Sequence, residues 1–180
     1  MNNSQTILDF WFKEIDSSLW WQKNHEFDEL IRQRFGKTHQ QATRGELAHW
    51  RTDAHGRLAE ILVLDQFSRN LYRNQPQAFA YDLAALVLAQ HTVSLGLDKS
   101  LNTVEKSFLY LPFMHSESAI IHQQAVELYN QAGLEFNLSF EFKHKAIIDR
   151  FGRYPHRNAV LGRDSTPAEL LFLQQPDSGF

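Results

Sequence analysis

Three segments of the chain place acid–base or anion-binding side chains among apolar neighbours. In the first, residues 61–73, the side chains of Asp65, Arg69 and Arg73 recur every four residues. If one helix runs through the segment, they share a face. A charge on a buried helix is expensive unless it is paired, and Asp65 with Arg69 is the simplest pair. The spacing therefore fits either an anion site in which Asp65 fixes Arg69, or a structural ion pair at an arginine-rich helix end.

The second segment, residues 111–117, sets a histidine and a glutamate at an expected helix start. His115 titrates near neutral pH and is a candidate general acid or base, with Glu117 beside it. The same pattern suits metal ligation, but a complete site needs further ligands such as Asp65 or His144. It also suits plain helix capping, because an acid is favoured in a first turn. We expect no metal and no cofactor, because the chain has no recognised metal-binding motif.

The third segment, residues 144–163, has the highest density of positive charge. Its lysines and arginines are opposed by Asp149 alone, which leaves a local charge of +4. Arg153 and Arg157 carry the planar fork that matches a phosphate or a carboxylate, and Asn158 can orient such a ligand. Two alternatives stay open: these arginines pair with acids elsewhere in the chain, or they contact nucleic acid.

The elements that must position these segments are predicted to be helices. Caps, glycines and prolines agree with helical periodicity, and no stretch shows sustained strand-like alternation. We therefore expect a single helical domain over residues 1–180, all-α, with seven to nine helices. The helix from Asp53 is apolar around most of its circumference and should be central, and the helix from Asn102 should stop near Pro112. Expected helix starts are Ser4, Asn24, Asp53, Pro76, Asn102, Ser116, Ser139 and Thr166.

The composition excludes several classes of protein. The chain has 180 residues, of which 43% are apolar and 22% charged, so it can build a packed core. A net charge of −3 argues against a nucleic-acid coat. The lack of cysteine removes disulfides, thiolate metal sites and a cysteine nucleophile. The longest apolar run, residues 83–89, is far shorter than the roughly 20 residues of a membrane span. Because the N-terminus has no secretory signal, we expect a cytoplasmic protein.

Four stretches of the sequence, residues 7–12, 64–70, 110–117 and 150–158, read ILDFWF, LDQFSRN, YLPFMHSE and RFGRYPHRN. With them the chain resembles, over nearly its whole length, an uncharacterised bacterial family, domain of unknown function nine-two-four. Family members often carry Pro where Ser68 stands and Glu where Met114 stands. The resemblance implies a compact, tetratricopeptide-like array of antiparallel helices. It implies no established activity, cofactor or catalytic residues.

The leading hypothesis brings the three segments together in one polar pocket. Its ligand is expected to be a small anion or a metabolite with a carboxylate or phosphate group. The acid–base candidates are His115, Glu117 and His156. The expected ligand-binding residues are Asp65, Arg69, Asn70, Arg153, Arg157 and Asn158.

Two other hypotheses stay open on the sequence alone. The chain can be an interaction module whose helical groove, near Trp20 and Trp21, holds a peptide from a partner. Alternatively, the polar motifs brace the helices and bind nothing. The sequence predicts neither a reaction nor an oligomeric state.

Overall fold

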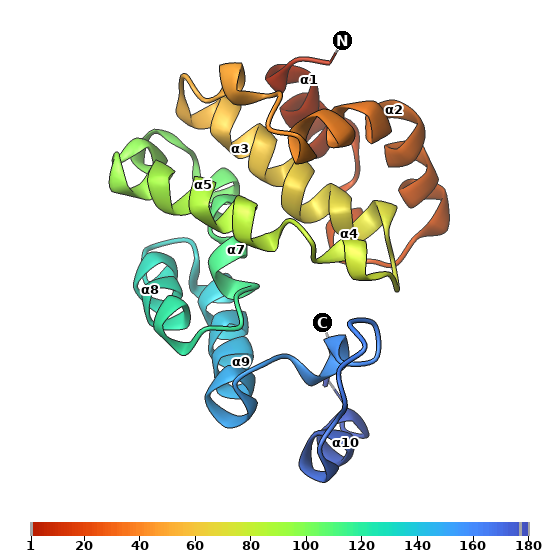
Figure 1. The fold of residues 1–180 in the computed structure, drawn as a ribbon. Coiled ribbons are helices and arrows are strands. Elements are labelled where there is room, and N and C mark those ends of the chain that lie inside the picture. Colours follow the sequence, from red (N-terminus) through yellow and green to blue (C-terminus); the bar gives the residue numbers. More distant parts are fainter. Residues whose placement is uncertain (1, 177, 180) are drawn as a thin grey trace.

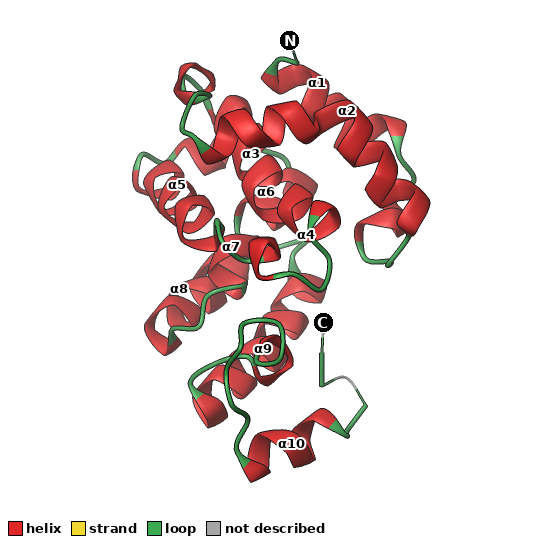
Figure 2. Ribbon diagram, turned by 45° about the vertical axis from the view of Figure 1, so that its right-hand side comes forward, coloured by secondary structure: helices red, strands yellow, loops and turns green. Residues whose placement is uncertain are grey.

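The structure is an array of helices joined by short turns (Figures 1 and 2). It is a computed structural model and describes residues 2–176, 178 and 179. It is 70% helical, and the described residues form no strand, so the all-α prediction is confirmed. The helices are α1 (Ser4–Asp9), α2 (His25–Thr43), α3 (Ala54–Leu62), α4 (Ser68–Leu71), α5 (Asp82–Ser94), α6 (Thr103–Leu109), α7 (Leu111–Met114), α8 (Ala119–Tyr129), α9 (Glu135–Phe151) and α10 (Pro167–Leu173).

The helix that begins after Asp53 lies at the centre of the main core. Every residue from 56 to 68 is buried, and α3 packs against α1, α5 and α6. Aromatic rings fill the space around it, with Phe10 4.7 Å from Phe35 and Trp11 5.7 Å from Phe67, centroid to centroid. Large rings bury much apolar area per residue, so a modest number of contacts builds the core.

The chain changes direction after α9. Gly152 adopts the left-handed conformation at φ 69° and ends the helix, as a glycine does readily. Residues 152–176, which we call the C-terminal arm, then run away from α9 and end in α10 (Figure 1, blue). The arm is tied back to the helical array by Tyr154, whose hydroxyl donates to the Met114 carbonyl, and by Arg157, which reaches Asp82.

Several helix starts follow the predicted caps. The Asn24 side chain accepts from the Phe27 amide at 2.9 Å, and Asp53 accepts from Gly56 at 2.8 Å. Reciprocal capping boxes form between Asn102 and Glu105 and between Thr166 and Glu169. These starts were predictable because the capping bonds are local.

Other predicted boundaries are wrong. Asn3, not Ser4, caps α1. Pro76 opens only a short 3₁₀ turn, Pro76–Ala78, before α5 begins at Asp82. The helix from Asn102 does stop near Pro112, at Leu109. Pro112 itself lies in the first turn of α7, where a proline is tolerated because the amide has no helical partner.

The starts predicted at Ser116 and Ser139 are also wrong. The helix after Ser116 begins at Ala119, and the residue before it, Ser118, makes no side-chain capping bond. Ser139 lies inside α9, where its hydroxyl donates to the Phe136 carbonyl at 2.6 Å. A serine can make such a bond within a helix as readily as it caps one, so its type alone does not mark a start.

Among the described residues, no helix combines the length and the apolar character that crossing a bilayer requires.

Candidate functional site

Asp65 lies in an irregular turn of a long helix. A π-helical segment, Val63–Phe67, joins α3 to α4, and single π turns inside α-helices are frequent at functional sites. The Asp65 carboxylate is 1% exposed, and its Oδ1 lies 2.7 Å from His115 Nδ1 and 3.1 Å from Arg69 Nη1. Burial raises the pKa of Asp65, but the charge of Arg69 and the hydrogen bond from His115 outweigh it and hold the pKa below its usual value. Asp65 is therefore an anion.

His115 is held by Asp65 in one tautomer. Because Asp65 is ionised, His115 Nδ1 carries the proton and donates it to the carboxylate. Burial and the nearby charge of Arg69 lower the pKa of His115, so the ring is neutral at neutral pH. Its Nε2 makes no hydrogen bond to any described residue, and 15% of the side chain stays exposed. A carboxylate that orients a neutral imidazole with a free second nitrogen is the arrangement of a general base.

Two arginines share one carboxylate beside this pair. Arg69 donates to both oxygens of Asp82, at 2.9 and 3.1 Å. Arg157 reaches the same Asp82 at 3.2 Å and the His115 carbonyl at 3.1 Å. The Arg157 guanidinium lies 4.6 Å from the ring centroids of both Phe79 and Tyr154. This stacking fixes its plane and adds cation–π attraction.

These contacts define the polar centre: Asp65, Arg69, Asp82, His115 and Arg157. Asp82 was not predicted as a site residue, because its local signal is an acid in a first helical turn, a position favoured for any acid. With His115 neutral, the two carboxylates balance the two guanidinium groups. An incoming anion must therefore displace Asp82 from the arginines.

Glu117 belongs to a neighbouring cluster and not to the polar centre. Its carboxylate accepts hydrogen bonds from Nη1 and Nη2 of Arg163, at 2.6 and 2.9 Å, and from the Tyr154 amide at 2.7 Å. Arg163 also donates to Asn158 at 2.9 Å. Burial raises the pKa of Glu117, but the bonds to Arg163 and Tyr154 outweigh it and hold the pKa below its usual value. Glu117 thus attaches the C-terminal arm to the helical array, and Asn158 braces the arm internally through Arg163.

Two predicted ligand-binding residues bind acids outside the polar centre. Asn70 donates to Asp28 at 2.8 Å, and Arg153 donates to both oxygens of Glu169, at 2.7 and 2.9 Å. Arg73 also binds Asp28 rather than continuing the face of Asp65 and Arg69, because α4 ends at Leu71. The structure therefore brings Asp65, Arg69, His115 and Arg157 together in the polar centre. Asn70 and Arg153 bind other acids and are not part of it.

His156, the third acid–base candidate, makes no hydrogen bond to a residue of the polar centre. Its ring packs 5.4 Å from that of Tyr154. Its Nδ1 is enclosed and makes no hydrogen bond to a described residue. Burial lowers the pKa of His156 to about 4. The described residues contain no group of three or more His, Asp or Glu side chains placed to hold a metal ion.

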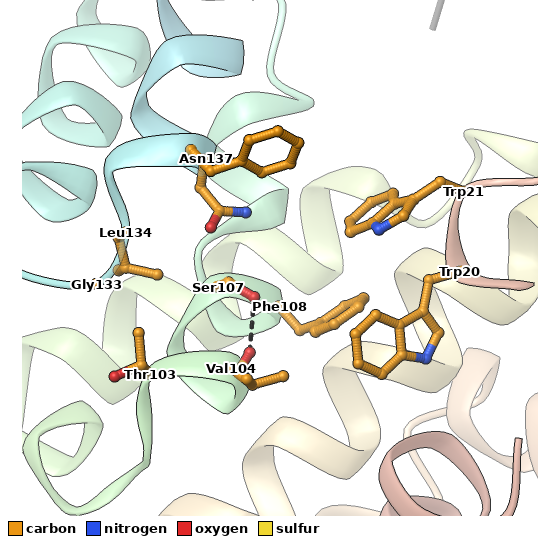
Figure 3. A pocket seen from close by; sticks show the side chains of 10 residues that line it. Trp20, Trp21, Thr103, Val104, Ser107, Phe108, Gly133, Leu134 and Asn137 are labelled. Atoms are coloured by element: carbon orange, nitrogen blue, oxygen red, sulfur yellow. Dashed lines mark hydrogen bonds between the residues drawn. The ribbon is translucent and has the colours of Figure 1, made fainter. Parts of the chain in front are cut away.

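A hollow of about 180 Å³ lies elsewhere, between the start of α9, α6 and the turn at Trp20 and Trp21 (Figure 3). Trp21 is 59% exposed and stacks on Phe108 at 5.6 Å and 9°. Figure 3 shows Trp20, Trp21 and Phe108 along one side and Asn137 across from them. A second, more polar hollow of about 350 Å³ is lined in part by Lys13, Asp53 and Glu105. Neither hollow is lined by a residue of the polar centre.

The fold and the site define a class: helical proteins with a buried, charge-balanced centre built on an aspartate–histidine pair. The chain belongs to the bacterial protein family of unknown function DUF924, whose model matches residues 7–177, as the motifs predicted. It is similar to the structure of a protein of unknown function, ATU0120 from Agrobacterium tumefaciens. The TM-score is 0.91 at 36% sequence identity, over 96% of this chain and 97% of that one. No curated protein matches the chain. These comparisons assign no activity.

Proposed function

We propose that the protein binds a small molecule with a carboxylate or phosphate group at the polar centre, and that His115 accepts a proton from that molecule or from a bound water. The observation that carries the proposal is the pairing of buried Asp65 with partly exposed His115. Asp65 keeps the proton on Nδ1, which leaves a lone pair on Nε2. A purely structural histidine has no need of a free nitrogen near solvent.

Asp82 supports an anionic ligand because its carboxylate already lies between two guanidinium groups. Arg69 and Arg157 bind it with bonds of 2.9–3.2 Å. The side chain of Asp82 is 16% exposed and that of Arg157 8%. A ligand carboxylate or phosphate that entered from solvent would meet Asp82 first and take its place on the arginines.

In this proposal the remaining predicted residues do not touch the ligand but hold the segments that carry the polar centre. Glu117 and Asn158 hold the segment that carries Arg157, and Arg153 holds the same segment through Glu169. Asn70 supports the end of α4 through Asp28. His156 packs under Tyr154, whose ring stacks on Arg157. The cytoplasmic location expected from the sequence is part of the same proposal.

The test is thermal unfolding in the presence of phosphates and carboxylates at constant ionic strength. A ligand that binds the native state raises the unfolding temperature by mass action. Because Asp82 competes with the ligand, Asp82→Asn should respond more strongly than the wild type, and Arg157→Met should lose the response. Arg150→Met removes an exposed arginine and serves as the matched control.

The outcomes separate binding from bracing. Stabilisation of Asp82→Asn that vanishes when Arg157→Met is added supports the ligand site. If no compound raises the unfolding temperature of the wild type or of Asp82→Asn, the polar centre is a structural brace and the proposal fails. His115→Gln, which keeps a hydrogen bond to Asp65, then distinguishes proton transfer from binding once a ligand is found.

A second candidate function, an interaction module, is favoured by the aromatic hollow. Its rim includes Trp21 at 59% and Phe136 at 70% exposure, and exposed aromatic groups are enriched where proteins bind partners. The expected occupant is an apolar peptide side chain. Screening a random peptide library on the wild type and on Trp21→Ala tests this function. Peptides that bind both proteins equally would exclude the hollow as the peptide-binding site.

A further inference from the structure

Arg57, on α3, is a buried arginine without a carboxylate partner. It is 8% exposed. Among the described residues no Asp or Glu oxygen lies within 4.0 Å of its guanidinium. The other buried arginine, Arg157, has Asp82. The unpaired arginines Arg44 and Arg150 are exposed and are solvated by water.

This arrangement is energetically costly. An arginine does not lose its proton in a protein, so Arg57 cannot escape its charge by becoming neutral. A buried charge is strongly destabilising unless an opposite charge and hydrogen bonds accompany it. Glu60 follows on the same helix, but it is held by two bonds of 2.6 Å from Arg51. The residues that the structure describes therefore supply no counter-ion for Arg57.

Within the part of the chain that the structure describes, the Arg57 guanidinium hydrogen-bonds only to an exposed histidine on α5. Arg57 Nη1 lies 3.2 Å from His91 Nδ1. Because the guanidinium only donates, His91 Nδ1 must accept, and the ring is neutral with its proton on Nε2. Arg57 Nε is enclosed without a partner, and Nη2 makes no hydrogen bond to a described residue. A neutral imidazole is a weak substitute for an anion.

We propose that Arg57 and His91 form a binding site for an oxyanion, a phosphate or carboxylate group, at the surface between α3 and α5 (Figure 1). The oxyanion replaces His91 Nδ1 as the acceptor on Nη1 and also accepts from Nη2. The displaced imidazole turns and donates its own N–H to the same group. The bound anion neutralises a buried charge that otherwise has no counter-ion. The site shares no residue with the polar centre and does not depend on the function proposed for it.

The first experiment measures binding of inorganic phosphate, acetate and chloride at equal ionic strength. Titration calorimetry gives the affinity, and the side-chain nitrogen signals of His91 report on its tautomer. Phosphate or acetate, but not chloride, should shift the His91 signals. Arg57→Met should weaken binding at this site at least tenfold, whereas Arg44→Met, which removes an exposed arginine, should leave it unchanged.

The second experiment supplies the missing charge from within the chain. His91→Glu places a carboxylate beside Arg57 at an exposed position, so the variant should fold. It should unfold at a higher temperature than a His91→Gln control and no longer respond to phosphate. The proposal is overturned if no anion shifts the His91 signals, or if the His91→Glu variant is no more stable than the His91→Gln control. If no anion stabilises Asp82→Asn but phosphate or acetate still shifts the His91 signals, only the function proposed for the polar centre is refuted.

Discussion

At the scale of single residues, the partner of a charged side chain decides what that side chain can do. Arg153 faces both oxygens of Glu169 and is fully engaged, whereas His115 keeps one ring nitrogen free. His122 shows the opposite extreme to His115. Its ring and the Glu141 side chain are both fully enclosed, 2.6 Å apart. A pair so deeply buried contributes to structure and offers no access to a ligand.

Removing His122 should therefore destabilise the fold strongly. His122→Ala would leave Glu141 buried without its partner and would open a cavity. Losing one member of a buried pair costs about 3–5 kcal/mol of unfolding free energy. Urea denaturation at pH 7 measures this loss. Gln123→Ala, at the exposed neighbouring position, should change stability by less than about 0.5 kcal/mol. Similar values for the two variants would contradict the structural assignment.

At the scale of elements, close crossings of the chain set the positions of the helices. Gly56 on α3 passes the 3₁₀ turn Ala48–Trp50 so closely that a Cβ atom would lie 1.8 Å from the Trp50 carbonyl oxygen. Gly36, inside α2, has open space around the same position. The two glycines have the same chemistry and opposite structural roles.

The pair Gly56→Ala and Gly36→Ala tests this difference. Gly56→Ala should lower the unfolding free energy by about 1–3 kcal/mol or more, because the backbone must move to admit the methyl group. Gly36→Ala should raise it by roughly 0.5–1 kcal/mol, because alanine loses less conformational freedom in a helix. Chemical denaturation of both variants gives the two values. A neutral Gly56→Ala would show that α3 does not approach the turn this closely.

At the scale of the whole molecule, buried histidines join α9 to the C-terminal arm. The rings of His144 on α9 and His156 on the arm pack 5.8 and 5.4 Å from the Tyr154 ring, centroid to centroid. Burial lowers the pKa of His144 to about 3 and that of His156 to about 4. Both rings are therefore neutral in the folded protein at pH values where an unfolded chain is protonated.

Stability should consequently fall as the pH is lowered from about 6.5 towards 4. In this window the unfolded chain binds protons, with a histidine pKa near 6.5, before the folded protein does. Each unit of pKa difference corresponds to about 1.4 kcal/mol, and the raised pKa of Glu141 offsets part of the loss. Urea denaturation between pH 7 and 4.5 measures the slope.

A matched pair of variants tests whether the buried histidines cause this dependence of stability on pH. His156→Gln should flatten the pH dependence, because it removes one group that differs between the two states. His25→Gln, at an exposed position at the start of α2, should leave the slope closer to that of the wild type. If His156→Gln keeps the full slope, the buried rings do not control acid stability.

The local sequence determined which segments are helical and which family the chain belongs to. Capping bonds such as that of Asn24 to Phe27 span three residues, so residue order alone predicts them. It also singled out Asp65, Arg69, His115 and Arg157 as unusual charges in apolar company. Their convergence was predicted because a buried charge needs a partner.

Only the tertiary structure decided which partner each charge finds. Arg157 meets Asp82 across 75 residues and Asn70 meets Asp28 across 42. Nothing in the local sequence marks those acids as the partners of Arg157 and Asn70. A pairing between distant residues depends on how whole helices pack, and α4 must end at Leu71 for Arg73 to turn toward Asp28. The same packing buries Arg57 with no carboxylate from a described residue beside it, because Arg51 binds Glu60, the nearest acid on the same helix.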